Sequence, residues 1–340
     1  MIVQQTIQSM ENPYVKQFPE LLEGKTLLYV HGFGSSGQSG TVNRLRTVFP
    51  RSTVIAPDLP VHPDEAIALL RQLCADKHPD IILGTSMGGM YTEQLRGFDR
   101  ICTNPALCIA DTMQAHGMTG TQQFQNPRLD GQQTFYVDKA LVKEYRQVSE
   151  HRFEGLDDDD RQHVYGLFGD HDDVVDTYDL FHEHYPQTIR FHGEHRMDDR
   201  SFMHSVLPVI RWIDDRQEHR ERPIVYIGME TLTDAYQHPT SSSQKAVRQL
   251  IEHYQVFFVA PAASSDIHRY ADVTAWLEEY INVPAWAHTV FTNQRHLLYG
   301  DYLIEARETP DAMATTILFG SDTFKTWDDI IDYFGRLGGQ

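Results

Sequence analysis

The stretch "ILGTSMGGM", residues Ile82–Met90, decides the fold of this 340-residue chain. It contains the pattern G-x-S-x-G, which raises a serine onto a sharp turn between a strand and a helix. The apolar residues before the pattern predict a strand, and the segment after it has helical character. Gly84 and Gly88 suit such a turn, because side chains at these positions would clash in it. We therefore expect the hydroxyl of Ser86 to be exposed at the carboxyl end of a sheet.

Strands and helices alternate on both sides of this turn. Short apolar runs such as "TLLYV" (Thr26–Val30) predict strands, and "PDEAIALLRQLCADKHPD" predicts a helix with one apolar face. A loop-like stretch and a helical one break the alternation from about residue 111 to 160, and "HVYGLFG" and "TIRFHG" resume it. Such β-α-β alternation predicts an α/β fold, with a parallel sheet and helices on both faces. We interpret residues 111–160 as an insertion and a candidate lid.

An almost wholly charged segment, "DDRQEHRER" (Asp214–Arg222), precedes a second series of alternating strands and helices. Domain boundaries fall in segments of this kind, because few contacts cross them. The sequence therefore predicts two α/β domains, residues 1–216 and 217–340.

The charge and composition disfavour several classes of partner. A net charge of -19 and a pI near 5.3 argue against nucleic acid, because phosphate backbones are held by clustered Lys and Arg. No apolar run approaches the roughly 20 residues of a membrane span, and the N-terminus lacks the pattern of a secretion signal. Cys74, Cys102 and Cys108 stand in apolar surroundings without C-x-x-C spacing, which indicates buried thiols in a reducing compartment. We expect a cytoplasmic protein with no nucleic-acid or membrane partner.

A serine hydroxyl needs a base to take its proton and an acid to orient that base. In this kind of fold they follow in the order Ser, Asp, His. The loop "DHDDVVD" after the strand "VYGLFG" supplies the acids. We choose Asp172, because the apolar pair Val174 and Val175 follows it and can anchor the loop. Asp170 and Asp176 remain the alternatives.

The next strand is followed by "FHGEHRM", which supplies the histidine. His195 lies at the far end of that loop, where it can reach the serine, whereas His192 is closer to the strand. Stabilising a developing oxyanion also requires a pair of N–H groups. We assign them to Met87, at the start of the helix after the serine, and to Phe33, in the loop "HGFGSSGQSG" after the first strand.

Metal and cofactor sites are the weaker alternatives. Five histidines cluster in the sequence and could suggest a metal: His182, His184, His192, His195 and His204. No cysteine and no H-E-x-x-H spacing accompany them, so we predict no metal site. The acidic run Asp157–Asp160 is most simply a solvated loop, with a calcium site as the alternative. Residues 32–37 of the loop after the first strand, "GFGSSG", have the spacing G-x-G-x-x-G, but no G-K-[ST] is present, and we predict no cofactor.

In their order along the chain, these segments resemble the YqiA-like esterases, a small α/β-hydrolase family. The resemblance covers about residues 25 to 214 and rests on "LLYVHGFGSSGQS", "APDLPVHPDEAIALL", "GTSMGG", "TNPA", "NPRLDGQQ", "DHDDVVDTY" and "HGEH". It implies an α/β-hydrolase fold, a Ser86–Asp172–His195 triad and ester hydrolysis through an acyl-enzyme. Thr85 and Asp130 depart from the residues usual in that family, and neither belongs to the triad.

The second domain resembles the 5′(3′)-deoxyribonucleotidase branch of the haloacid-dehalogenase-like (HAD) phosphatases, which implies a Rossmann-like α/β fold. The resemblance rests on "VYIGMETL", "VFFVAPAAS" and "NQRHLLYGDYLIEARETPDAMATTILFGSDTFKTWDDIIDYF". It implies a D-x-D pair of nucleophile and acid/base, a threonine, a lysine and a metal-binding acid pair. At those positions this chain has, in the same order, Gly228 and Glu230, Val259, Arg295, and Glu305 with Ala306. Without a nucleophilic carboxylate or a full set of Mg²⁺ oxygens, phosphoryl transfer has no means, so we expect an inactive domain.

The sequence thus predicts a serine hydrolase that cleaves a small-molecule carboxylic (acyl) ester. An acyl thioesterase would use the same residues, and a non-catalytic binding or regulatory protein would leave the triad idle. Residual phosphatase activity would need Glu230 or Asp234 to replace the missing aspartate.

Overall fold

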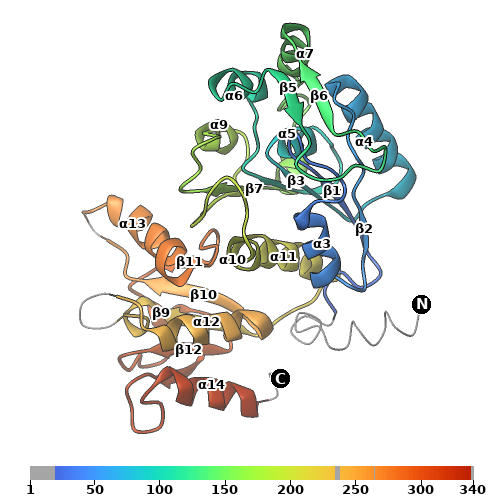
Figure 1. Ribbon diagram of the computed structural model, residues 1–340. Coiled ribbons are helices and arrows are strands. Elements are labelled where there is room, and N and C mark those ends of the chain that lie inside the picture. The colour runs from blue at the N-terminus through green and yellow to red at the C-terminus, as the bar shows by residue number, and fades with distance from the viewer. Residues whose placement is uncertain (1–19, 234–237, 264, 338–340) are drawn as a thin grey trace. The chain divides into compact units, whose positions relative to one another are not determined.

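The computed structural model describes residues 20–233, 238–263 and 265–337. The chain divides into two compact units, Met1–Asp214 and Asp215–Gln340 (Figure 1). Residues 1–19, in which the sequence has no secretion-signal pattern, lie outside the described residues, as does Asp234.

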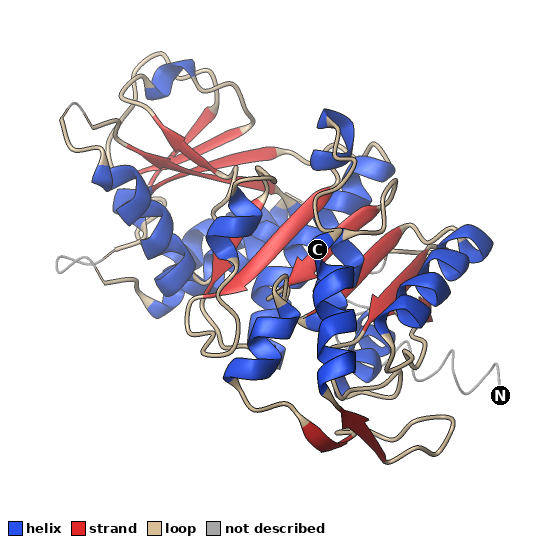
Figure 2. Ribbon diagram, turned by 90° about the horizontal axis from the view of Figure 1, so that it is seen from above, coloured by secondary structure: helices blue, strands red, loops and turns tan. Residues whose placement is uncertain are grey.

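Six parallel strands form the sheet of the first unit, in the order β2-β1-β3-β4-β7-β8. Their bounds are β1 Thr26–Val30, β2 Thr53–Ile55, β3 Ile81–Thr85, β4 Asp99–Thr103, β7 Val164–Gly169 and β8 Thr188–Phe191. Helices lie on both faces of this sheet (Figure 2), so its central strands are apolar along nearly their whole length. This sheet confirms the predicted α/β fold class.

The helices of this unit follow the signals in the sequence. In α4 (Pro63–Lys77), the proline stands at the first position and Ala66, Ile67 and Leu70 are buried on one face. The helix ends at His78, which has the left-handed conformation typical of a helix end (φ 44°). The other helices are α3 Gly40–Val48, α5 Met87–Glu93, α6 Ile109–Ala115, α7 Lys139–Glu150, α8 Asp158–Arg161, α9 Tyr178–His182, α10 Asp199–Ser201, a π-helical turn Phe202–Val206 and α11 Leu207–Gln217.

The insertion has more structure than the sequence predicts. Residues 116–133, expected to be a loop, contain β5 (Gly120–Gln123), which pairs antiparallel with β6 (Thr134–Val137). The residues of β5, "GTQQ", give no alternating apolar signal, so the hairpin is invisible to pattern analysis. Only β6 buries side chains, those of Phe135 and Val137.

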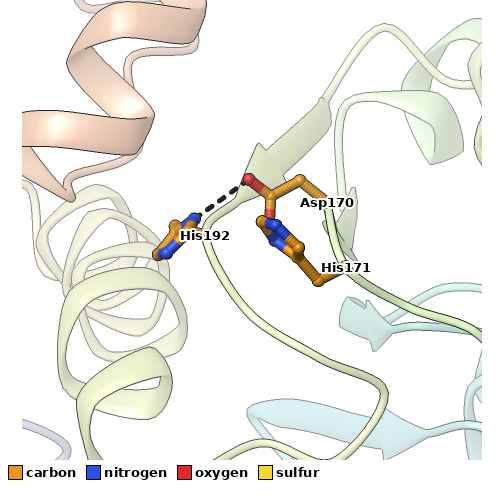
Figure 3. A group of neighbouring side chains, drawn as sticks. All are labelled: Asp170, His171 and His192. Atoms are coloured by element: carbon orange, nitrogen blue, oxygen red, sulfur yellow. Dashed lines mark hydrogen bonds and ion pairs between the residues drawn. The ribbon is translucent and has the colours of Figure 1, made fainter.

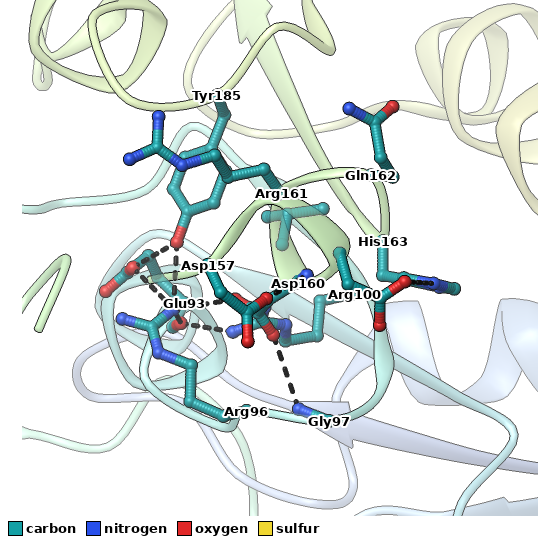
Figure 4. A network of polar contacts seen from close by, with 12 residues as sticks. Glu93, Arg96, Gly97, Arg100, Asp157, Asp160, Arg161, Gln162, His163 and Tyr185 are labelled. Atoms are coloured by element: carbon teal, nitrogen blue, oxygen red, sulfur yellow. Dashed lines mark hydrogen bonds and ion pairs between the residues drawn. The ribbon is translucent and has the colours of Figure 1, made fainter. Parts of the chain in front are cut away.

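A buried polar network surrounds the end of α5, the helix that follows Ser86 (Figure 4). Glu93 is fully buried and accepts hydrogen bonds from the hydroxyl of Tyr185 and from the guanidinium of Arg96 (3.1 Å). Asp160, near the end of the insertion, forms ion pairs with Arg100 (2.6 Å) and Arg96 (3.4 Å). The network therefore fixes the end of the insertion to α5.

This network corrects the interpretation of the acidic run Asp157–Asp160. The side chain of Asp160 is only 10% exposed and is ion-paired, so the run is not simply a solvated loop. Asp157 caps α8 by accepting a hydrogen bond from the N–H of Asp160 (2.7 Å). Asp157, Asp158 and Asp159 are exposed, as expected, although Asp158 and Asp159 begin the short helix.

The second unit has a parallel sheet of five strands, in the order β11-β10-β9-β12-β13. Its elements are β9 Ile224–Gly228, a 3-10 turn Met229–Thr231, α12 Ser241–His253, β10 Gln255–Ala260, α13 His268–Trp276, a π-helical turn Leu277–Ile281, β11 Thr289–Phe291, a 3-10 turn Arg295–Leu297, β12 Tyr302–Glu305, β13 Thr315–Leu318 and α14 Trp327–Arg336. Thr326 and Asp329 form a capping box at the start of α14. The apolar face of α14 packs into the core of this unit through Trp327, Ile330 and Phe334.

The cysteines and the hydrophobic character of the helices can be compared with the expectations from composition. Cys74 and Cys102 are buried, as expected, whereas Cys108 is only half-buried, and all three are free thiols. Among the described residues, no helix combines the length and apolar character that a membrane crossing requires.

Candidate active site

The serine turn has the geometry that its sequence predicts. Ser86 stands between the end of β3 and the start of α5, with φ at 56°, in the left-handed region that non-glycine residues seldom adopt. A Cβ atom at Gly84 would lie 2.2 Å from the Thr92 hydroxyl oxygen, and one at Gly88 would lie 2.0 Å from the carbonyl oxygen of Val30. Only glycine fits these two positions, and the strained turn holds the serine at the end of the strand.

The loops after β7 and β8 bring an acid and a histidine to this serine. His195 Nε2 lies 3.0 Å from Ser86 Oγ, and His195 Nδ1 lies 2.8 Å from Asp172 Oδ2. The other carboxylate oxygen of Asp172 accepts hydrogen bonds from the N–H groups of Val174 (2.8 Å) and Val175 (2.9 Å). The structure therefore brings together the three residues chosen from the sequence, and the two valines fix the acid through their backbone.

The environment of Asp172 favours its charged form. Burial raises the pKa of this carboxyl, but the hydrogen bonds from His195, Val175 and Val174 outweigh burial and hold the pKa below its ordinary value. An ionised Asp172 accepts a hydrogen bond from the N–H at His195 Nδ1, which leaves Nε2 of the neutral ring as an acceptor facing the Ser86 hydroxyl. The hydrogen bonds thus set the tautomer that a general base requires.

The alternative residues are placed differently. Asp170 binds His171 (2.6 Å) and His192 (3.1 Å) rather than His195. Asp176 is exposed. The geometry therefore favours Asp172 over both alternatives as the partner of His195.

The two N–H groups assigned to the oxyanion stand at the turns on either side of the serine. Met87 is the first residue of α5, so its N–H has no acceptor within the helix. The loop containing Phe33 passes close to Ser86, since a Cβ atom at Gly32 would lie 3.3 Å from Ser86 Cβ. In the part of the chain that the structure describes, neither N–H donates a hydrogen bond. Both are free to bind an oxygen atom.

Asn104 is a positioning residue that sequence reasoning missed. It follows β4, is 1% exposed and has φ at 43°. Its side chain accepts the N–H of Gly169 (2.7 Å) and donates to the carbonyl oxygens of Glu194 and His195 (both 3.1 Å). It thereby ties the loop of the histidine to the end of β7. The motif "TNPA" was the available signal, but it does not show which side-chain contacts the asparagine makes.

His31 is a second positioning residue without a role in the sequence prediction. It is 2% exposed, its Nδ1 donates to the carbonyl oxygen of Gly32 (2.8 Å), and its Nε2 accepts the N–H of Leu59 (3.0 Å). The bond from Leu59 requires the neutral ring, because a protonated Nε2 cannot accept a hydrogen bond. Burial lowers the pKa of His31 from its ordinary 6.5 to about 4.

We expect His31 to make the protein less stable in acid. On acidification the unfolded chain takes up a proton on His31 at a higher pH than the folded chain does. The contribution of neutral His31 to the free energy of unfolding is therefore fully present above pH 6.5 and is lost as the pH falls towards 4. At about 1.4 kcal/mol per pKa unit, this residue removes about 3 kcal/mol from the free energy of unfolding. In urea unfolding, the advantage of wild type over His31→Gln should narrow by that amount between pH 7 and pH 4. The exposed His116→Gln serves as the control, and parallel profiles for His31→Gln and wild type would contradict the assignment.

In the second unit, the HAD-type positions gather at the carboxyl ends of the strands. Arg295 forms ion pairs with Glu230 and with Glu305 (2.5 Å), and Thr309 donates a hydrogen bond to Glu305. A Cβ atom at Gly228 would lie 2.8 Å from a carboxylate oxygen of Glu230. Val259, by contrast, is fully buried in the apolar core. Glu230, Arg295 and Glu305 thus form an ion-paired cluster beside Gly228, and Val259 is the partner of Gly228 in the neighbouring strand.

Comparison with known proteins finds one family model and several similar proteins. The model of a family described as "Uncharacterised protein family (UPF0227)" matches residues 26–212. The chain is also similar to a "Putative 5'(3')-deoxyribonucleotidase" of Vibrio phage KVP40, 26% identical over 102 residues (29% of this chain), and to one of Staphylococcus aureus, 30% identical over 103 residues (27% of this chain). The chain spans 60% and 57% of the lengths of these two relatives. These matches confirm the two resemblances found in the sequence.

Solved structures also align with the chain. Est1E from Butyrivibrio proteoclasticus covers 58% of this chain and 88% of its own, at 15% identity and a TM-score of 0.39. A marine microorganism esterase covers 58% and 95%, at 15% identity and a TM-score of 0.36. At such TM-scores, the fold class rests on the strand order and the serine turn of the chain itself.

Proposed function

This chain belongs to the UPF0227 family through residues 26–212, and from that premise we propose that it is a serine hydrolase of carboxylic esters. One observation supports the proposal above all: an unbroken line of hydrogen bonds from Asp172 through His195 to Ser86, on a strained strand-to-helix turn. A structural serine requires neither the strain nor a buried carboxylate behind its histidine.

In the proposed mechanism, the Ser86 hydroxyl attacks the acyl carbonyl carbon while His195 Nε2 takes its proton. The carbonyl π electrons move to the oxygen, and the N–H groups of Phe33 and Met87 bind the resulting oxyanion. When the oxyanion collapses, the ester C–O bond breaks and His195 returns its proton to the leaving alcohol. Water, deprotonated by the same histidine, then hydrolyses the acyl-enzyme and frees Ser86. Asp172 remains ionised and stabilises the imidazolium during both the formation and the hydrolysis of the acyl-enzyme.

We place the wall of the acyl pocket in the insertion, residues 111–160. The ring of Phe135 packs edge-to-face on Phe33, with the ring centroids 5.2 Å apart. Gln125 donates its N–H to the carbonyl oxygen of Gly34 (2.7 Å), and the Ser36 hydroxyl donates to the carbonyl oxygen of Pro127 (2.7 Å). These contacts join the insertion to the loop of the proposed oxyanion group, which supports its role as a lid beside the reacting carbonyl.

Hydrolysis of p-nitrophenyl esters with acyl chains of increasing length tests the proposal. We expect turnover with a preferred chain length, which measures the pocket. The same acyl groups offered as thioesters separate an esterase from a thioesterase by the ratio of the two kcat/KM values. No turnover of either class would favour the binding-protein alternative.

We propose that residues 217–340 form a HAD-like domain without phosphatase activity, and the compact unit that begins at Asp215 supports this domain division. In place of a nucleophilic carboxylate, Gly228 ends β9. Arg295 pairs with both Glu230 and Glu305, the two carboxylates at the positions implied for catalysis and metal binding, and offsets one of their two negative charges. A cation held in this way repels Mg²⁺. An assay with Mg²⁺ and deoxynucleoside monophosphates should therefore release no phosphate above background.

The ion-paired cluster should be structural. Glu305 is 1% exposed, so Arg295→Leu would leave its carboxylate without a cation and lower the free energy of unfolding by about 3 kcal/mol or more. Arg307→Leu, at an exposed position, should change it by at most about 0.5 kcal/mol. Urea unfolding of the full chain measures both. The double variant Arg295→Leu/Glu305→Leu should recover most of the lost stability. Equal stability of Arg295→Leu and Arg307→Leu would contradict a structural role for the cluster.

A further inference from the structure

A second cluster of chemically active side chains lies at the ends of β7 and β8, outside the hydrogen-bonded line to Ser86. Asp170 directly follows β7, and His192 directly follows β8. Because these strands are parallel neighbours, the two residues leave the sheet side by side. The N–H of Asp170 donates to the carbonyl oxygen of Phe191 (2.9 Å), and Gly193 donates its N–H to Asp170 Oδ1 (3.0 Å). The backbone thus holds the cluster on the rigid edge of the sheet.

Three side chains converge there: Asp170, His171 and His192 (Figure 3). The carboxylate of Asp170 lies between the two imidazoles, with His171 Nδ1 2.6 Å from Oδ1 and His192 Nδ1 3.1 Å from Oδ2. One nitrogen or oxygen atom of each residue lies within 4.8 Å of those of the other two. The side chain of Asp170 is 34% exposed, and those of His171 and His192 are 64% and 39% exposed, so solvent reaches the cluster.

In contrast to the expectation from sequence spacing, we propose that Asp170, His171 and His192 bind a divalent transition-metal ion, with Zn²⁺ as the ion that best suits them. Two imidazoles and a carboxylate form a ligand set that Zn²⁺ favours, whereas Mg²⁺ and Ca²⁺ prefer oxygen ligands. The ion takes the place of the protons that the histidines now share with Asp170, and the displaced protons leave to solvent. Water completes the coordination on the exposed side.

The position of this site gives the ion a mechanical role. Asp172 follows Asp170 by two residues, and His195 follows His192 by three. An ion bound to Asp170 and His192 therefore joins the loop of the acid to the loop of the histidine, close to the sheet. It would hold both loops without touching Ser86. The proposal is independent of ester hydrolysis, because metal binding is measured on the protein itself.

Titration of metal-free full-length protein with Co²⁺ tests the proposal, because visible absorption reports the coordination of this ion, and calorimetry with Zn²⁺ runs in parallel. We expect a single ion per chain, a Tm that rises with metal and falls back with chelator, and no effect of Mg²⁺. His171→Gln and His192→Gln should each weaken binding at least about tenfold, since second-shell changes alone cost that much. His116→Gln, at an exposed position well before the cluster in the sequence, should bind the metal as wild type does.

Two results would overturn the proposal. One is the absence of metal-dependent absorption and heat in wild type, which would leave the cluster a hydrogen-bonded group only. The other is binding that both ligand variants retain, which would place the ion elsewhere. His171 is the most exposed of the three residues, so its variant should keep the circular dichroism spectrum of wild type and remain interpretable even if His192→Gln unfolds.

Discussion

Ser86→Ala is expected to lower kcat for ester hydrolysis by about 10⁴-fold to 10⁶-fold, the largest effect of any single substitution in this chain. Alanine has no atom that can attack the carbonyl carbon, and no water molecule replaces the hydroxyl with the same geometry. Alanine and serine tolerate the left-handed φ of 56° to a similar degree, so the fold should survive the change. Steady-state kinetics on the preferred p-nitrophenyl ester measure the effect.

Ser241→Ala is a matched control, because this serine is exposed at the start of α12. It should leave kcat within about twofold of wild type, as surface substitutions usually do. If Ser86→Ala kept more than a small fraction of the wild-type kcat, the nucleophile would be another residue and the proposed mechanism would be wrong.

Asp172→Asn is expected to lower kcat by about 10⁴-fold. The amide can present an N–H to His195 Nδ1 in place of an acceptor, which moves the ring proton to Nε2. The nitrogen that faces Ser86 then carries a proton and cannot act as the base. The amide also cannot stabilise the imidazolium by charge. KM should change little, because neither effect concerns the binding of the ester.

The control for this prediction is Asp176→Asn, in the same loop but exposed. It should retain kcat within about twofold of wild type. The opposite pattern, with a severe loss in Asp176→Asn and little in Asp172→Asn, would show that the acid has been assigned to the wrong residue of the loop.

Local patterns explain what the sequence predicts well. The turn around Ser86 depends on glycines next to it and on an apolar strand before it, all within a few residues. Each strand can be recognised from a short apolar run, and the alternation of these strands with helices predicts the parallel sheet. The sequence leaves Asp170 and Asp176 open as alternatives to Asp172. The contact of the Asp172 carboxylate with His195, and the N–H groups of Val174 and Val175 that hold it, favour Asp172.

Contacts between distant segments explain what the sequence does not predict. Asn104 binds backbone groups that lie 65 to 91 residues further along the chain, and no pattern around "TNPA" announces them. Asp160 reads as one acid among four, yet it is paired with Arg100 across 60 positions of sequence. The cluster of Asp170, His171 and His192 likewise comes from two loops that become neighbours only because β7 and β8 pair.

The most direct test of the central claim is covalent labelling with a fluorophosphonate probe, followed by peptide mapping by mass spectrometry. Such probes phosphonylate a serine only when a base activates it and an oxyanion site receives the phosphoryl oxygen. We predict a single label, on Ser86, and a rate of labelling that falls sharply in His195→Gln. No label, or a label on another serine, would contradict the proposal that Ser86 is an activated nucleophile.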